Sequence, residues 1–214
     1  MYDRLDRIRE ELAKARQKKE EADEVLSKIG SEIEVINLDT STRAKESKEP
    51  FTTSTMQQEA FAKLKFKTKK TQFVAQTLYE GITVDNEHVG LITYMRTDST
   101  RISDEFINSA YAFINDNYGK EYVGYVKVAK SKDNVQDAHE GIRPTSINRS
   151  PEAIKKYLSN DEYKLYKLIY IRALASLMAN AKFLATTIKF DNNGYLFKAT
   201  GSVLTFDGYL KVYK

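Results

Sequence analysis

One short segment of the sequence combines a tyrosine with two arginines and several small polar residues. Residues 90–103 read Gly-Leu-Ile-Thr-Tyr-Met-Arg-Thr-Asp-Ser-Thr-Arg-Ile-Ser. The oxygen of Tyr94 is a potential nucleophile, but with a pKa of about 10 only about one tyrosine in a thousand is ionised at neutral pH. Arg96, two residues later, can stabilise both a phenolate and the charge that builds on phosphate oxygens. In an extended segment the two side chains project from the same face, so the pattern suits chemistry on a phosphodiester.

The same segment resembles a known active-site signature. Ile-Thr-Tyr-Met-Arg-Thr-Asp-Ser-Thr, at residues 92–100, is similar to the signature of the bacterial type IA DNA topoisomerases. Two flanking segments agree with that family in order and spacing: Pro-Phe-Thr-Thr-Ser-Thr-Met-Gln-Gln at residues 50–58, and Ala-His-Glu-Gly-Ile-Arg-Pro at residues 138–144. Phe-Asp-Gly-Tyr at residues 206–209 also fits. The resemblance covers about residues 32–214, and we assign no counterpart to residues 1–20.

The resemblance implies a role for each matched residue. Tyr94 would be the nucleophile that becomes linked to a 5′ phosphate, and Arg96 would hold both that phosphate and the tyrosine. His139 and Arg143 would lie near the same phosphate, while Thr97 and Asp98 would support the loop. By residue type alone, each of these side chains could instead be structural, and Gln57 and Gln58 suit a helix surface as well as a DNA contact. The expected set that contacts DNA or phosphate is therefore Arg96, Thr97, Asp98, Arg101, His139, Arg143, Gln57 and Gln58.

The resemblance also implies a reaction, a cofactor and partners. Enzymes of this family cut and reseal one DNA strand without ATP and relax negative supercoils. Their magnesium is bound by acidic residues at Asp-x-Asp-type spacing, N-terminal to the region matched here, and this sequence has no such run. We therefore expect no metal site in this chain, which would be a central fragment that is not competent alone. Its partners would be single-stranded DNA at the cleavage site and the remaining domains of its parent, in the bacterial cytoplasm and without a membrane.

Composition leaves two other functions open. The chain has 214 residues and no cysteine, which excludes disulfides and thiolate metal sites. Its formal net charge of +4 favours a nucleic-acid partner only weakly. Residues 61–73 hold five lysines and no acid, with Phe66 among them. Lysines neutralise phosphates and aromatic faces stack on unpaired bases, so a non-catalytic module that binds single strands is one alternative. A structural fragment whose N-terminal helix pairs with another chain is the other.

The hydrophobic pattern predicts an α+β protein. Helices are expected over residues 1–30, 56–64, 68–79 and 103–119, from residue 151, and after residue 160. A short strand is expected at residues 31–38, followed by a polar linker at 39–50. Residues 185–190 and 195–200 flank Asp-Asn-Asn-Gly and predict a hairpin, with a third strand at 203–206. We predict a helical, tyrosine-bearing domain at residues 51–183, inserted into a strand-containing domain formed by 1–50 and 184–214, which the resemblance identifies as the family's arch.

Overall fold

The computed structural model describes residues 2–125 and 140–213, and it confirms an α+β fold. The chain forms two compact units. Unit 1 comprises Met1–Arg43 and Phe183–Val203, and unit 2 comprises Ala44–Lys182 and Leu204–Lys214. The larger segment of unit 2 therefore lies between the two segments of unit 1 in the sequence, and the chain passes between the units three times, after Arg43, Lys182 and Val203.

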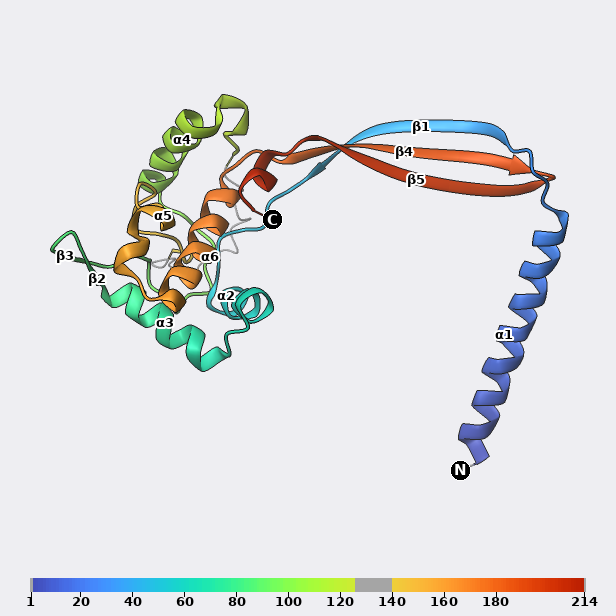
Figure 1. Ribbon diagram of the computed structural model, residues 1–214, viewed down its shortest axis with the longest axis horizontal. Helices are drawn as coiled ribbons and strands as arrows, with labels where there is room; N and C mark the ends of the chain where they lie inside the picture. The colour runs from blue at the N-terminus through green and yellow to red at the C-terminus, as the bar shows by residue number, and fades with distance from the viewer. Residues whose placement is uncertain (1, 126–139, 214) are drawn as a thin grey trace, which may run out of the picture. The chain divides into compact units, whose positions relative to one another are not determined.

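Unit 1 consists of one long helix and most of a three-stranded sheet (Figure 1). Helix α1 spans Tyr2–Lys28. The sheet has the order β1-β4-β5, with β1 at Glu34–Lys45, β4 at Ala181–Asn192 and β5 at Tyr195–Phe206. No described helix, the long α1 included, is apolar enough over its length to cross a membrane.

The hairpin between β4 and β5 turns on two residues with positive φ and also holds the end of α1. Asn193 (φ 52°) and Gly194 (φ 84°) form the turn, as the Asn-Gly pair predicts. The side chain of Asn192 accepts from the amide of Gly30 at 2.7 Å and donates to the carbonyl of Gly30 at 2.9 Å. Asn193 donates to the carbonyl of Lys28 at 2.8 Å. These bonds satisfy backbone groups that the end of a helix leaves unpaired.

Two sequence predictions for this sheet are wrong. Residues 39–45 are not linker but the second half of β1, and residues 203–206 are not a separate strand but the end of β5. Every residue of β1 is exposed, so no buried face imposes an alternation of polar and apolar residues on its second half. Gly201 looks like a strand break in the sequence, but β5 runs through it.

Unit 2 is mostly helical (Figure 1). Its central helix is α6 (Asn160–Ser176), which buries residues on several faces and packs against α3 (Thr68–Glu80) and α5 (Pro151–Ile154). The remaining helices are α2 (Thr53–Glu59), continued by a π-helical turn η1 (Ala60–Leu64), α4 (Asp104–Tyr118), and the short turns η2 (Lys120–Tyr122), η3 (Lys155–Tyr157) and η4 (Gly208–Lys211).

Side-chain caps start α5 and α6, whereas Ser103, the N-cap residue of α4, makes no capping hydrogen bond. Ser159 forms a reciprocal capping box with Glu162, and Ser150 caps α5 ahead of Pro151. Helix α2 begins earlier than residue 56, because Thr52 and Thr55 form a second capping box around its first turn.

A small hairpin was not predicted. Strands β2 (Ile82–Val84) and β3 (Glu87–Val89) pair antiparallel between α3 and the Tyr94 segment. Asp85 and Asn86 occupy its turn with φ values of 49° and 71°. Asp and Asn tolerate this conformation better than most residues, so the Asp-Asn pair was the available signal.

A buried ion pair ties both ends of unit 2 to α6. Nη1 of Arg172 lies 2.8 Å from Oε2 of Glu59, and its Nε donates to the carbonyl of Glu49 at 2.5 Å. The hydroxyl of Tyr213 donates to the other carboxylate oxygen of Glu59. Burial and this hydrogen bond raise the pKa of Tyr213 to about 12, although Arg172 acts in the opposite direction. Glu49 lies shortly after the first passage into unit 2 and Tyr213 shortly after the last, so Arg172 holds both of these segments to α6.

Candidate active site

Three segments that are far apart in the sequence meet in unit 2 as a small irregular sheet. Phe51 pairs antiparallel with Ile142, and Ile92 pairs antiparallel with Pro144. The amide of Ile142 donates to the carbonyl of Phe51 at 2.7 Å. The segment at residues 142–144 therefore lies between the other two, and each of the three segments carries one of the motifs identified in the sequence.

Thr93 locks the tyrosine segment to the central one. Its amide donates to the carbonyl of Arg143 at 2.9 Å, and its hydroxyl donates to the carbonyl of Gly141 at 2.8 Å. The same hydroxyl accepts from the amide of Arg143 at 3.0 Å. The residue immediately before Tyr94 is thus fixed by both backbone and side chain.

Gly141 allows this close packing. A Cβ at this position would lie 3.1 Å from the Cβ of Pro50, and 3.3 Å from both the carbonyl oxygen of Ser99 and the Cα of Thr100. Any larger residue would push apart the segments on either side, which explains a glycine within the Ala-His-Glu-Gly-Ile-Arg-Pro motif.

Exposure alternates along the segment that follows. The side chains of Tyr94, Arg96 and Asp98 are exposed, whereas those of Met95, Thr97 and Ser99 are buried. This is the period of two expected for extended backbone. The phenol of Tyr94, which is 37% exposed, and the guanidinium of Arg96 therefore reach solvent from alternate positions of a supported backbone.

The buried positions hold the loop through local hydrogen bonds. The hydroxyl of Thr97 accepts from the amide of Ser99 at 3.1 Å, and the hydroxyl of Ser99 accepts from the amide of Arg101 at 3.2 Å. The buried hydroxyl of Thr97 is thus engaged in the turn of the loop, and a contact between Thr97 and DNA stays a prediction. Thr53, in the first turn of α2, also bonds to the backbone of Thr97. We did not identify Thr53 from the sequence.

Arg143 is buried, with a relative exposure of 9%. Its Nε donates to Glu140 at 2.6 Å, Nη1 to the carbonyl of Pro144 at 2.9 Å, and Nη2 to the hydroxyl of Ser103 at 3.1 Å. The guanidinium also lies 4.4 Å from the ring centroid of Phe106. All three nitrogens thus donate within the protein, and Arg143 fixes the segment at residues 140–144. Contact between Arg143 and a phosphate stays a prediction.

Glu140 is the charged partner in that arrangement. Burial acts to raise its pKa, but the hydrogen bond and the positive charge of Arg143 outweigh burial and hold the pKa below its ordinary value. The carboxylate is therefore ionised at neutral pH and neutralises the buried guanidinium.

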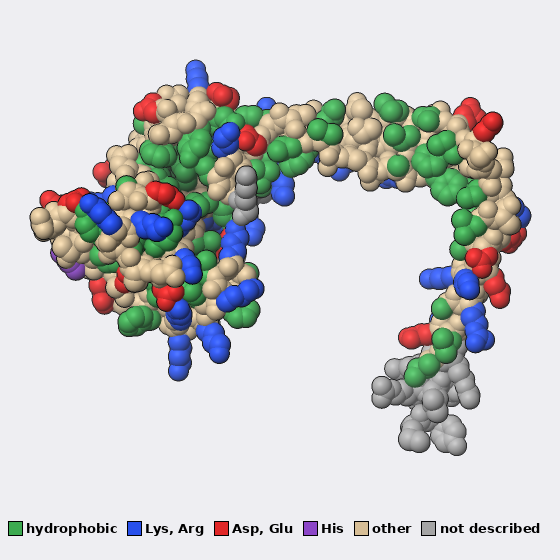
Figure 2. Space-filling model, viewed as in Figure 1, with side chains coloured by type: hydrophobic (Ala, Val, Ile, Leu, Met, Phe, Trp, Pro, Cys, Tyr) green, Lys and Arg blue, Asp and Glu red, His purple; other side chains and the backbone are tan. Residues whose placement is uncertain are grey.

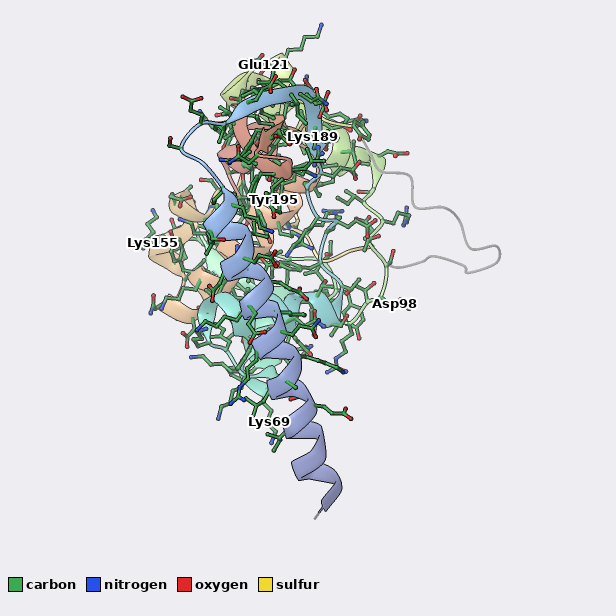
Figure 3. The ribbon with its side chains drawn as sticks, turned by 90° about the vertical axis from the view of Figure 1, so that its right-hand side faces the viewer. Lys69, Asp98, Glu121, Lys155, Lys189 and Tyr195 are labelled. Atoms are coloured by element: carbon green, nitrogen blue, oxygen red, sulfur yellow. The ribbon has the colours of Figure 1, made fainter. Side chains whose placement is uncertain are left out.

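The remaining candidates differ in their accessibility. Asp98 lies at the surface of unit 2 (Figure 3), and Arg101 and Gln58 are also exposed, whereas Gln57 is half-buried. His139 lies outside the described residues. Another residue missed by the sequence analysis, Tyr79, touches the ring of Tyr94.

The lysine-rich segment differs in detail from its expected use. Phe66 is buried and carries the ammonium of Lys70 over its ring at 4.4 Å, so it does not offer a face to a base. Phe61 and Phe73, at the ends of the segment, are exposed instead. Lys63 pairs with Glu59 at 3.2 Å. Figure 2 shows Lys and Arg side chains projecting from the part of unit 2 that carries α2 and α3.

The described residues do not fit a magnesium site. Within residues 2–125 and 140–213, no three His, Cys, Asp or Glu side chains gather in a group that could hold a metal ion. Magnesium prefers carboxylate ligands together with substrate phosphates. We therefore derive no step through a metal bound to this chain.

Comparison with known proteins gives a consistent result. The sequence profile of a family described as DNA topoisomerase matches residues 4–214, and so includes most of residues 1–20, for which the motifs gave no counterpart. DNA topoisomerase 1 of Mycoplasmoides gallisepticum is 43% identical over 204 residues, covering 91% of this chain and 28% of the relative. The structure of full-length topoisomerase I from Thermotoga maritima superimposes with a TM-score of 0.78 and 42% identity, covering 89% of this chain and 31% of that one. The chain thus spans less than a third of the length of either relative.

Proposed function

This chain belongs to the bacterial type IA DNA topoisomerase family, and from that premise we propose that it carries the tyrosine with which its parent enzyme cuts and reseals one DNA strand. The observation that supports this most directly is the exposed phenol of Tyr94. Thr93, the residue before it, is fixed through both its backbone and its side chain, and Arg96, two residues after it, is also exposed.

The proposed reaction exchanges one phosphodiester for another. The phenolic oxygen of Tyr94 attacks the phosphorus, a phosphotyrosyl bond to the 5′ phosphate forms, and the 3′ oxygen of the neighbouring nucleotide leaves with a proton. Attack by that 3′ hydroxyl reverses the step and restores the strand. The two esters are similar in energy, so resealing needs no ATP, and passage of the other strand through the gap changes DNA topology.

Arg96 has the chemistry to assist both directions. A guanidinium donates paired hydrogen bonds to phosphate oxygens, and its charge stabilises the negative charge that builds on those oxygens in the transition state. Arg101, exposed five residues further on, has the charge to contact a neighbouring phosphate of the same strand.

The rest of the parent chain would supply what this region lacks. The family resemblance implies magnesium held by acidic residues N-terminal to the matched region, and further surfaces for single-stranded DNA. This chain alone would not complete the reaction. An enzyme that acts on the bacterial chromosome would work in the cytoplasm.

The test is a covalent adduct. In the full-length parent enzyme, Tyr94→Phe removes only the phenolic oxygen, so it should abolish cleavage of labelled single-stranded DNA and leave noncovalent binding near normal. Tyr125→Phe, a matched change at another exposed tyrosine, should cleave like the wild type. Adducts are read on denaturing gels. A persistent adduct in the Tyr94→Phe enzyme would assign the chemistry to another residue, and no adduct in the wild type would favour the non-catalytic DNA-binding module.

A further inference from the structure

A second tyrosine ring contacts Tyr94, and nothing in the proposed chemistry uses it. The rings of Tyr79 and Tyr94 meet edge to face, with centroids 5.3 Å apart and planes inclined by 62°. Aromatic pairs favour this geometry, which places the positive edge of one ring against the negative face of the other. Tyr79 is 40% exposed and Tyr94 37%, so the pair lies at the surface and is not an obligatory part of the core.

The backbones that carry the two rings are joined. Tyr79 lies in the last turn of α3, and the amide of Leu91 donates to the carbonyl of Leu78 at 2.8 Å. A Cβ on Gly90 would lie 2.8 Å from the carbonyl oxygen of Tyr79, so a glycine permits this close approach. The β2–β3 hairpin spans the residues between, and its His88 contacts the carbonyl of Glu80 at 3.2 Å. The end of α3 and the start of the Tyr94 segment therefore form one supported corner.

A ring contact on such a corner restricts the side chain of Tyr94. An exposed tyrosine can occupy several staggered χ1 rotamers, and holding it in one of them has an entropic cost. A nucleophile reacts from a pose in which its oxygen lies about 3–3.5 Å from the atom it attacks. A neighbour that selects one rotamer before DNA arrives removes part of that cost from the reaction.

We propose that Tyr79 is a positioning residue that holds the ring of Tyr94 in the orientation from which it attacks DNA. This inference rests on the proposed function of Tyr94 as the nucleophile. The effect comes from the aromatic ring of Tyr79 and not from its hydroxyl, and this distinction makes it testable.

The kinetic arm uses the full-length parent enzyme. Tyr79→Leu keeps an apolar side chain but removes the ring, and it should slow single-turnover cleavage by about two- to tenfold, the range expected for one aromatic pair. Tyr79→Phe keeps the ring and should restore the wild-type rate. The wild type, Tyr79→Leu and Tyr79→Phe should bind a noncleaved single strand with equal affinity. Their melting temperatures should agree to within a few degrees. Thr83→Ala, an exposed change on the intervening hairpin, serves as the matched control.

The spectroscopic arm uses the 214-residue chain with fluorotyrosine at position 94. The ¹⁹F shift of that residue should change in Tyr79→Leu and stay near the wild-type value in Tyr79→Phe and Thr83→Ala. Cleavage at the wild-type rate by Tyr79→Leu, or equal slowing in Tyr79→Leu and Tyr79→Phe, would overturn the positioning role. If the wild-type enzyme formed no adduct on Tyr94, the proposed function and this role would both fail, and the ¹⁹F shifts would still show whether the ring contact exists.

Discussion

Thr53 and Thr97 are joined by hydrogen bonds in both directions, although 44 residues separate them in the sequence. The amide of Thr53 donates to the carbonyl of Thr97 at 2.9 Å, and the amide of Thr97 donates to the hydroxyl of Thr53 at 2.9 Å. That hydroxyl has its own proton directed at the carbonyl of Met95, 2.8 Å away, with the carbonyl of Thr97 at 3.1 Å. The first turn of α2 therefore holds the backbone on both sides of Arg96.

Replacing Thr53 by valine tests this brace. The substitution keeps the β-branched shape but leaves the amide of Thr97 without its acceptor, so the free energy of unfolding should fall by about 1–3 kcal/mol. Thr53→Ser keeps the hydroxyl and should lose less. Urea denaturation of the chain measures both, and hydrogen exchange at the Thr97 amide locates the effect. Equal stability of the valine variant and the wild type, with unchanged protection of that amide, would contradict the role assigned to the hydroxyl.

Replacing Arg96 by lysine tests the geometry of charge at the site. Lysine keeps the positive charge but acts as a point charge, whereas a guanidinium makes paired hydrogen bonds to a phosphate. Loss of one preorganised transition-state contact costs on the order of a hundredfold or more in rate. Single-turnover cleavage by the full-length Arg96→Lys enzyme should therefore be slower by about that factor, with noncovalent DNA binding little changed.

The control for that experiment is Arg149→Lys. Arg149 contacts Thr145 at 3.4 Å and takes no part in the Tyr94 loop, so this variant should cleave at the wild-type rate. Cleavage by Arg96→Lys at the wild-type rate would remove Arg96 from the mechanism.

The sequence predicted the residues of the Tyr94 segment but not what supports them. A tyrosine and an arginine two positions apart are visible in one line of sequence, and an extended segment exposes them together. The brace by Thr53 and the ring contact of Tyr79 depend on where the chain returns in space, and no local pattern encodes that return. The surroundings of Arg143 could not be predicted for the same reason. Its guanidinium donates to Glu140, Ser103 and the carbonyl of Pro144, and the sequence does not show that these groups lie together.

The secondary-structure errors have a related cause. Helices α3 and α4 each have a buried stripe and end at a glycine, so periodicity located both of them closely. Strand β1 is exposed along its whole length, so its second half shows no alternation of polar and apolar residues from which a strand could be predicted. Its extent is set by pairing with β4, which begins more than a hundred residues later.

Tyr213 should make the stability of unit 2 sensitive to alkaline pH. Its pKa is raised from 10.0 to about 12 by burial and by its hydrogen bond to Glu59. A group whose pKa is higher in the folded state stabilises the fold fully below its unfolded pKa, and that contribution is lost as the pH rises through its folded pKa. The contribution of the Tyr213 hydroxyl should therefore be constant below about pH 10 and disappear between about pH 10 and 12.

Comparison with Tyr213→Phe isolates this residue, because Tyr166 and Tyr170 also have raised pKa values. The difference in unfolding free energy between the wild type and Tyr213→Phe should shrink over that interval as measured by urea titration. A difference that stays constant across it would show that the hydroxyl does not titrate in the folded protein as described.

The last prediction concerns the 214-residue chain on its own. It should bind a labelled single-stranded oligonucleotide weakly, because its lysines and the arginines near Tyr94 can release counterions from phosphates while its net charge is only +4. Binding should weaken steeply with salt. The double change Lys67→Glu and Lys69→Glu, on the exposed surface leading into α3, should reduce affinity, whereas the same charge change at Lys18 and Lys19 on α1 should have a smaller effect.

No covalent adduct should form even with magnesium, because the described residues offer no acidic cluster to place a metal against the scissile phosphate. Mixing chain, oligonucleotide and magnesium, followed by denaturing electrophoresis, tests this directly. An adduct on Tyr94 would show that the nucleophile and its neighbouring cations suffice for the cleavage step.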